Sequence, residues 1–350
     1  MADIGKISSR FFDQMIRDRL GAERSEVTVK PRFGVDVSVV DLPSGLAMMM
    51  TSDPLSLIPS LGLEESAWLS VHLMANDMAT TGFAPMYGQF VLNLPAGFSP
   101  HDFSVYWDYI HRFCADIDVA VTGGHTGFVE GQNSTIAGGG TLISIAPRNE
   151  VLVSSGAQAG DAVLVTKSCA LSSAGILALS FPETIHQKLG KEILEQARES
   201  FYQTSSLKDA LIAAGEEKRH PEVTAMHDVT EGGVLGAIYE MAAASEKGVL
   251  VKNDQIPIGE TQREICELFD LDSRYCIGAG SMIITCRKNT SAKVIKRLNQ
   301  AGIPCTEVGE IKAPEYGMKI EKDGEVKDLL YYEKDPYWEA FYKAIQAGWK

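Results

Sequence analysis

The chain has 350 residues, of which 45% are hydrophobic and 22% are charged. This is more than one small core needs, so we expect two domains and exclude a peptide, a coiled coil and a disordered chain. The 46 acidic residues against 32 Lys and Arg give a net charge of −14. Because that field repels phosphate backbones and anionic membranes, we expect neither nucleic acid nor a membrane as a partner.

The compartment is indicated by the first residues and by the cysteines. The segment after Met1 has no apolar signal region, and no apolar run reaches the roughly 20 residues that cross a bilayer. We therefore expect a cytoplasmic protein. No two cysteines form a C-x-x-C pair, which is typical of reduced thiols in a core rather than of disulfides or zinc ligands. The six are Cys114, Cys169, Cys266, Cys276, Cys286 and Cys305.

The first predicted element is a β-hairpin. Apolar and polar residues alternate over 35–39, turn residues follow, and a second apolar run covers 46–50. A tight turn between the two runs sets Asp36 opposite Thr51 and brings Asp53 close in space. Two carboxylates are then expected to crowd one end of the hairpin.

A helix is predicted over 64–80, because apolar residues recur at helical spacing, acidic residues stand at its start and Gly82 follows as a stop signal. Asp77 lies in the last turn of this helix. The helix dipole disfavours a negative charge there by a few tenths to about 1 kcal/mol, so we expect a cation nearby to compensate it.

Glycine-rich segments flank the next predicted strands. A short strand over 119–122 runs into the glycine-rich segment 123–127, and the glycines at 138–140 precede a strand over 141–146. Each glycine segment is either a tight turn or a phosphate cradle. The segment 147–149 is the natural seam of the chain. We therefore predict an N-terminal domain over residues 1–150 and a C-terminal domain over residues 151–350.

Helices and strands alternate again in the second half, and no repeat of 20 to 50 residues is present. The fold class is therefore α/β plus α+β. A final helix that covers a core edge is predicted from the stripe of Trp338, Phe341 and Ile345. The other predicted elements are strands over 162–166 and 282–285 and near Val308, and helices over 172–179, around Val234 and before Gly302.

Several common catalytic motifs are absent. The only Lys followed by Ser or Thr is Lys167, which Thr166 precedes where a P-loop requires Gly. No G-x-G-x-x-G motif opens a helix, and no G-x-S-x-G elbow suggests a hydrolase. His125, between glycines and Thr126, is the most unusual of the seven histidines, although a lone histidine in a turn is usually structural.

Four carboxylates are the better candidates for chemistry. Asp36 and Asp53 belong to the hairpin, Asp77 to a helix end, and Asp228 to a segment rich in polar residues and glycine. If such groups gather, they repel one another by kilocalories per mole unless a hard cation lies between them. Magnesium is the natural candidate, because it keeps several waters and also binds nucleotide phosphates. For any single aspartate, a capping or turn role is the commoner alternative.

Five motifs in order resemble the aminoimidazole ribonucleotide (AIR) synthetase superfamily, over residues 30 to 312. This superfamily includes the purine enzyme, selenophosphate synthetase, thiamine monophosphate kinase and the carbamoyl dehydratase of hydrogenase maturation. The segment 227–244 is most similar to the dehydratase. The motifs are Asp36-Val37-Ser38-Val39-Val40, Thr51-Ser52-Asp53-Pro54, Asn76-Asp77-Met78-Ala79, Thr122-Gly123-Gly124-His125-Thr126 and His227-Asp228-Val229-Thr230-Glu231-Gly232-Gly233.

The resemblance implies an α/β N-terminal domain that pairs in a homodimer, ATP in the resulting cleft, and an α+β C-terminal domain that closes over it. It implies that ATP phosphorylates a substrate atom, typically an amide oxygen, which then leaves as phosphate. The implied magnesium ligands are Asp36, Asp53, Asp77 and Asp228. The implied nucleotide-binding residues are Asn76, Asp77, Gly123, Gly124 and Thr126, and the implied catalytic residues are His125, Lys167 and Asp228.

The chain departs from the dehydratase in two places. It ends in Gly348-Trp349-Lys350 without the terminal cysteine that carries the carbamoyl group, so an external or divergent carboxamide substrate is expected. His125 replaces an acidic residue, as in selenophosphate synthetase, whose reactive Cys or Sec and N-terminal lysine have no evident counterpart here. His125 either donates to phosphate or accepts a substrate proton.

We therefore predict an enzyme that depends on ATP and Mg²⁺ and activates an amide-type oxygen, with a possible maturation partner protein. Two alternatives remain open at this point. One is a small-molecule kinase of the thiamine monophosphate kinase type, and the other is a nucleotide-binding maturation or regulatory protein with little turnover.

Overall fold

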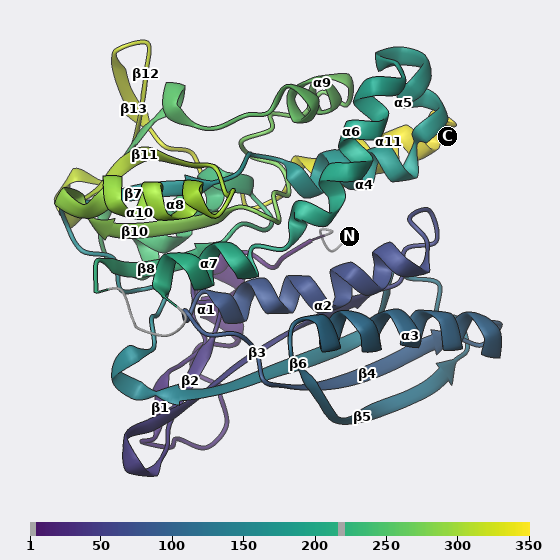
Figure 1. Ribbon diagram of the computed structural model, residues 1–350, viewed down its shortest axis with the longest axis horizontal. Helices are drawn as coiled ribbons and strands as arrows, with labels where there is room; N and C mark the ends of the chain where they lie inside the picture. Colours follow the sequence, from purple (N-terminus) through teal and green to yellow (C-terminus); the bar gives the residue numbers. More distant parts are fainter. Residues whose placement is uncertain (1–4, 216–220) are drawn as a thin grey trace.

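The computed structural model describes residues 5–215 and 221–350, which form two sheets with helices packed on and between them (Figure 1). The first sheet has the order β1-β2-β3-β6-β4-β5. Its strands are β1 (Val27–Val29), β2 (Ser38–Asp41), β3 (Leu46–Ser56), β4 (Tyr87–Pro95), β5 (Ala120–Val129) and β6 (Ile136–Pro147). The helices α2 (Leu63–Ala79) and α3 (Pro100–Asp116) cover one face, and α1 is Ser9–Met15.

The second sheet has the order β13-β12-β9-β11-β7-β10-β8. Its strands are β7 (Asp161–Thr166), β8 (Val223–Asp228), β9 (Gly248–Lys252), β10 (Met282–Arg287), β11 (Cys305–Lys312), β12 (Met318–Lys322) and β13 (Glu325–Asp328). The helices are α4 (Leu171–Ser180), α5 (Pro182–Leu189), α6 (Lys191–Ser200), α7 (Leu207–Ala214), α8 (Gly233–Ala244), α9 (Glu260–Leu268), α10 (Ser291–Gln300) and α11 (Pro336–Gln346). Among the helices described, none has the length and apolar character that a bilayer crossing requires.

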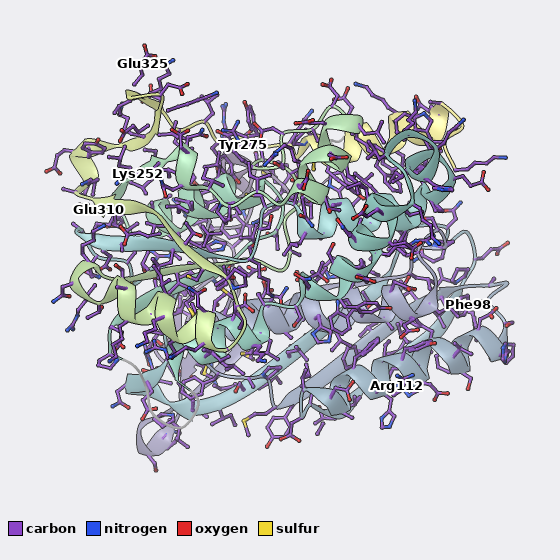
Figure 2. The ribbon with its side chains drawn as sticks, turned by 45° about the horizontal axis from the view of Figure 1, so that its top comes forward. Phe98, Arg112, Lys252, Tyr275, Glu310 and Glu325 are labelled. Carbon is purple, nitrogen blue, oxygen red and sulfur yellow. The ribbon has the colours of Figure 1, made fainter. Side chains whose placement is uncertain are left out.

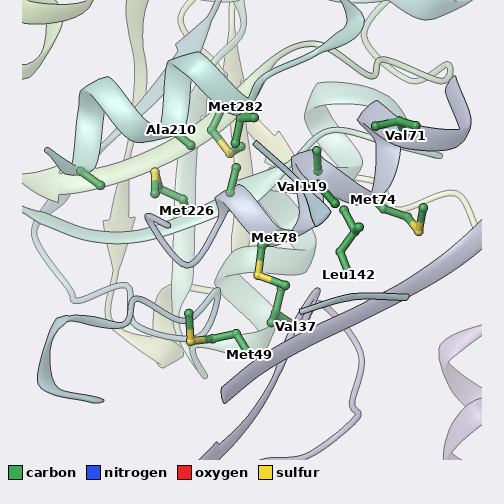
Figure 3. Close-up of a cluster of buried hydrophobic side chains, with 14 of the residues drawn as sticks. Val37, Met49, Val71, Met74, Met78, Val119, Leu142, Ala210, Met226 and Met282 are labelled. Atoms are coloured by element: carbon green, nitrogen blue, oxygen red, sulfur yellow. The ribbon is translucent and has the colours of Figure 1, made fainter. Parts of the chain in front are cut away.

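A continuous core joins the two sheets through α2 and α7. Met74 and Met78 of α2 are buried against the first sheet, while Ala210 of α7 packs in the same cluster as Met226 of β8 and Met282 of β10 (Figure 3). The two helices lie between the sheets in Figure 1. Because the apolar cluster does not stop at the connection between the sheets, the halves are held in a fixed relation.

Side chains on the outer surfaces point to solvent. Arg112 on α3 is exposed on the side away from the first sheet, and Glu325 lies in the β12–β13 hairpin that projects from the second sheet (Figure 2). All six cysteines are buried and free, which agrees with their prediction as core residues.

The face of the first sheet opposite α2 and α3 is uncovered. Strand β5 is the sheet's edge, and nearly all of its residues are exposed. Exposed apolar side chains gather on it and on strands β3, β4 and β6 of the same sheet. They are Leu46, Tyr87, Val91, Val121, Phe128, Val129, Ile136 and Ile145. An open edge with this composition is typical of a surface that pairs with another chain.

The glycine-rich segments form strands, so the tight-turn alternative for 123–127 is wrong. Gly124 lies within β5 and pairs with Phe90 of β4 in parallel register, and the glycines at 138–140 belong to β6. Gly124 has φ +147°, and a Cβ there would lie 1.8 Å from the carbonyl oxygen of Phe90. The glycine therefore permits a close approach of two strands instead of a turn.

The predicted hairpin is present, but its register differs by one residue. Ser38 pairs with Met50 and Val39 with Met49, so the proposed pair of Asp36 and Thr51 is wrong. The connection is a three-residue turn, Pro43–Gly45, and Asp36 lies before the first paired residue. The sequence pattern did not distinguish a two-residue turn from a three-residue turn.

The final helix is confirmed as α11, and Trp338 and Phe341 of the predicted stripe pack against the core, whereas Ile345 does not. Tyr337 and Ala344 are buried, Phe341 packs against the same core, and Ile345 is 50% exposed. The core-facing side therefore includes Tyr337 and Ala344 in place of Ile345, and the Asp335 side chain caps the helix by accepting from the Tyr337 amide.

The close approach at Gly124 gives a stability prediction. Gly124→Ala is expected to lower the free energy of unfolding by at least about 2 kcal/mol, because the new Cβ forces β4 and β5 apart. Gly123→Ala is the matched control, since a Cβ there meets nothing within 4 Å. Urea unfolding of both variants measures the difference, and equal stabilities would contradict the strand assignment of Gly124.

Candidate functional site

Four aspartates that are distant in sequence converge where the two sheets meet. Asp53 comes from β3, Asp77 from the last turn of α2, Asp228 from the end of β8, and Asp36 from the segment before β2. Asp53 hydrogen-bonds to Asp77, and the charges of Asp36 and Asp228 act on both. Asp36, Asp228 and His227 each offer a ligand atom within 4.8 Å of the others.

The position of Asp36 follows from the chain that precedes it. Gly34 has φ +72°, and a Cβ there would lie 2.4 Å from the carbonyl oxygen of Glu240 in α8. Only glycine allows the segment to lie this close to the helix. Ser154 then donates a hydrogen bond of 2.9 Å to Asp36 and fixes the direction of its carboxylate.

No cation from the neighbouring helix turn compensates Asp77. Instead, the Thr51 hydroxyl donates a hydrogen bond of 2.7 Å to the Asp77 carboxylate. Burial raises the pKa of Asp77 well above its ordinary value, and the charges of Asp53 and Asp228 raise it further. This acid therefore holds a proton readily unless a cation approaches.

His227 lies inside the acidic group. Its Nδ1 is 2.7 Å from the backbone oxygen of Asp228, so Nδ1 carries a proton and fixes the ring. Its Nε2 is 3.5 Å from the carboxylates of both Asp36 and Glu240, which is too far for a good hydrogen bond. Burial lowers the pKa of His227, but the charges of Asp36, Glu240 and Asp228 outweigh it and raise the pKa to about 9.

Proton affinity is raised throughout the aspartate group. Burial raises the pKa of Asp228 to about 7, and the Asp36 charge adds to this. Burial also raises the pKa of Asp53 to about 6 and raises that of Asp36. Glu240 differs, because the nearby His227 ring and the charge of Lys6 outweigh its burial and lower its pKa to about 2.

Lys6 and Glu240 belong to the site although the sequence did not indicate them. The Lys6 ammonium lies 3.3 Å from a Glu240 carboxylate oxygen, and its charge also acts on Asp36 and Asp228. Tyr331 donates a hydrogen bond of 2.7 Å to the other Glu240 oxygen. A single lysine in a polar segment has no spacing that marks it, so only the fold reveals its place.

Asn76 is buried and faces away from the acids. Its side-chain nitrogen donates to the Thr204 carbonyl at 2.9 Å, and its oxygen accepts from the Ser206 amide at 2.7 Å. The side chain therefore joins α2 to the segment before α7.

Lys167 is also held by the protein. Its ammonium forms an ion pair of 3.0 Å with Asp209 and donates to backbone oxygens of Ser205 and Gly280 at 2.7 and 3.0 Å. Burial lowers the pKa of Lys167. In this conformation its ammonium already has partners and stabilises the loops around α7.

His125 and its neighbours lie apart from the acidic group within one copy of the chain. They belong to the edge strand β5, which β4 and β6 separate from Asp53 on β3. The structure thus brings together the four aspartates and leaves a second set of predicted residues on an exposed edge. This set is Gly123, Gly124, His125 and Thr126.

The acidic group fits a hard divalent cation. Its donors are carboxylate oxygens, which Mg²⁺ prefers. Asp228 Oδ2 and His227 Nε2 are buried without a hydrogen-bond partner among the described residues. Asp228 Oδ2 is an acceptor, and unsatisfied buried acceptors are rare, so a cation at this position would satisfy it. The ammonium of Lys6 stands where a positive charge is required.

The architecture defines a class of two-domain α/β plus α+β proteins whose halves meet over buried carboxylates. The models for AIR synthase related proteins match this chain, the N-terminal domain over residues 34–146 and the C-terminal domain over residues 158–320. The chain therefore belongs to the AIR synthase related family, which confirms the resemblance and the fold class drawn from the five motifs.

Curated relatives include hydrogenase maturation proteins. A putative hydrogenase expression/formation protein of Methanocaldococcus jannaschii is 24% identical over 66% of this chain and 65% of its own length, so about a third of that protein lies outside the match. The carbamoyl dehydratase HypE of Cupriavidus necator is 26% identical over 73% of this chain and 70% of its own. A selenide, water dikinase of Methanococcus maripaludis is 25% identical over 86% of this chain and 90% of its own length.

Solved structures share the fold across most of the chain. HypE in complex with ATP has a TM-score of 0.69 and 21% identity, covering 95% of this chain and 94% of that one. AaThiL complexed with AMPPCP and TMP has a TM-score of 0.71 and 17% identity, covering 94% and 96%. A HypE–HypF complex has a TM-score of 0.70 and 17% identity, covering 92% and 99%.

The raised pKa values give a prediction for metal binding. Mg²⁺ binds deprotonated carboxylates, so protons compete with it below the pKa values of about 6 for Asp53 and about 7 for Asp228. The affinity is therefore expected to rise as the pH increases from 5 to 8. Calorimetric titration with Mg²⁺ in the absence of nucleotide measures it, and an affinity that is constant or falls with pH would contradict the site.

Proposed function

We propose that this protein is an enzyme that uses ATP and Mg²⁺ to activate a carboxamide-type oxygen of a substrate by phosphoryl transfer. The observation that carries the proposal is the convergence of Asp36, Asp53, Asp77 and Asp228 at the junction of the sheets. ATP or an analogue of it occurs in the named complexes of two structural neighbours, HypE and AaThiL.

The chemistry requires positioning and charge neutralisation more than covalent assistance. Asp36 and Asp228 would hold the ion, and the Ser154 hydroxyl orients Asp36 for it. The hydrogen bond between Asp53 and Asp77 requires a proton on one of the two carboxyl groups. Both would complete the site once that proton is lost. Bound magnesium neutralises the triphosphate and stabilises the charge that develops during transfer.

The substrate is proposed to be external to this chain or divergent. All six cysteines are buried, so none of them presents a thiol to the acidic group. Two other segments contact residues beside the acidic group: Lys6 of the segment 5–8 contacts Glu240, and Trp338 of α11 contacts Glu231. A maturation partner is consistent with the HypE–HypF complex among the structural neighbours, and we propose one of that kind.

We also propose that the protein acts as a homodimer through the uncovered face of the first sheet. Within one copy, strands β4 and β6 separate His125 on β5 from Asp53 on β3. If His125 contacts nucleotide or substrate, a second copy must supply it. The exposed apolar residues on β4, β5 and β6 provide a surface for that pairing.

Asp228→Ala tests the role of the acidic group. We expect this variant to turn over ATP roughly a hundredfold more slowly or worse, because the loss removes charge stabilisation of the transferring phosphate. The dimer should stay folded. The measurement is magnesium-dependent ATPase activity, with circular dichroism as the control for folding, and near-normal activity would remove Asp228 from the site.

A complementation experiment tests the dimer. Neither His125→Ala nor Asp228→Ala alone is expected to be active. A mixture refolded together should regain about a quarter of the wild-type activity, since half of the dimers are then mixed and each has one intact site. A mixture as inactive as its components would place His125 outside a shared site.

Product analysis identifies the reaction type. A dehydratase or cyclo-ligase releases ADP and free phosphate, whereas a kinase of the thiamine monophosphate kinase type releases ADP and a stable phosphorylated product. We expect free phosphate with a carboxamide substrate. Magnesium-dependent ATP binding without any phosphate release would instead indicate a regulatory or maturation protein with little turnover.

A further inference from the structure

We infer that Lys6 is an exchangeable counter-cation of the acidic group, which Mg²⁺ displaces, and that residues 5–8 form a strap released by this exchange. The inference deepens the proposed function, because it concerns the same magnesium site. It assigns a positioning role to a residue outside every family motif in the sequence.

The charges at the site require a cation. Asp36, Asp53 and Asp228 are buried together with Glu240, and burial of several negative charges is costly without positive partners. Lys6 supplies one, 3.3 Å from Glu240. The Glu240 carboxylate is 3% exposed, whereas the Lys6 side chain is 52% exposed. The anion is thus fixed in the fold, and the cation reaches it from solvent and can leave again.

Few contacts hold the strap. The Lys6 amide donates a hydrogen bond of 2.8 Å to Glu231, and the Trp338 indole of α11 donates one of 3.0 Å to the other oxygen of Glu231. Gly5 packs against both side chains. Glu231 follows Asp228 by three residues. The residue that holds the strap is therefore close in sequence to one of the carboxylates that Lys6 neutralises.

Magnesium and the ammonium cannot share these carboxylates without repulsion. A divalent ion near Asp36 and Asp228 would repel the Lys6 charge, which interacts with both carboxylates. Since the ion carries two charges and the lysine is half exposed, the ammonium is the group that moves. Lys6 therefore stabilises the metal-free site and weakens metal binding.

The first test compares metal affinity in two lysine variants. Lys6→Met is expected to bind Mg²⁺ about tenfold more tightly than the wild type in the absence of nucleotide, because the competing charge is gone. Lys327→Met is the matched control, because it removes the same charge from a lysine that pairs with Glu325 on the exposed β12–β13 hairpin. Calorimetry measures both. An unchanged or weaker affinity in Lys6→Met would overturn the inference.

The second test follows the strap itself. Hydrogen–deuterium exchange of the peptide that contains Lys6 should speed up when Mg²⁺ is added to the wild type, as the amide leaves Glu231. Glu231→Ala should show fast exchange without Mg²⁺ and should also bind Mg²⁺ more tightly. Exchange that Mg²⁺ leaves unchanged or slows would contradict displacement of the strap.

These outcomes are separable from the proposed function. Both tests use metal alone, so exchange of Lys6 for Mg²⁺ can be established even if the protein ignores ATP. Conversely, magnesium-dependent ATP turnover combined with a metal affinity that does not respond to Lys6→Met would reject the strap and keep the proposed function.

Discussion

The structure depends on one electrostatic constraint, which is that several buried carboxylates share a small volume where two sheets meet. Burial raises the proton affinity of the aspartates, while His227 and Lys6 bring positive charge to the same place. Such an arrangement is stable only if protons, ammonium groups or a metal ion compensate the charge. The site is therefore prepared to exchange one kind of positive charge for another, which is what binding of Mg²⁺ and a triphosphate requires.

The continuous core explains how aspartates from four elements keep their relative positions. Helix α2 carries Asp77 and packs on the first sheet, while α7 and β8 pack against it from the second half. The glycine at position 34 brings the Asp36 segment onto α8. Backbone contacts and apolar packing thus fix the carboxylates, and their mutual repulsion is opposed by the stability of both halves.

Much of the fold could be predicted from the sequence, because periodic apolar residues mark α2, α8 and the buried strands. Part of the site could also be predicted, because the five motifs occur in the same order as in the AIR synthetase superfamily. Other features have no local signal. The glycines at 123 and 124 look like a turn but form an edge strand, since the sequence does not show which backbone approaches them. Lys6 and Glu240 meet across 234 positions of the chain, and no spacing predicts such a contact.

The most direct test of the central claim is a crystal structure with Mn²⁺ in place of Mg²⁺ and a nonhydrolysable ATP analogue. The anomalous signal of Mn²⁺ locates the ion independently of the protein model. We predict a manganese peak at coordination distance from Asp36 and Asp228, with triphosphate oxygens completing the coordination. A peak at another place, or a nucleotide bound away from the acidic group, would contradict it.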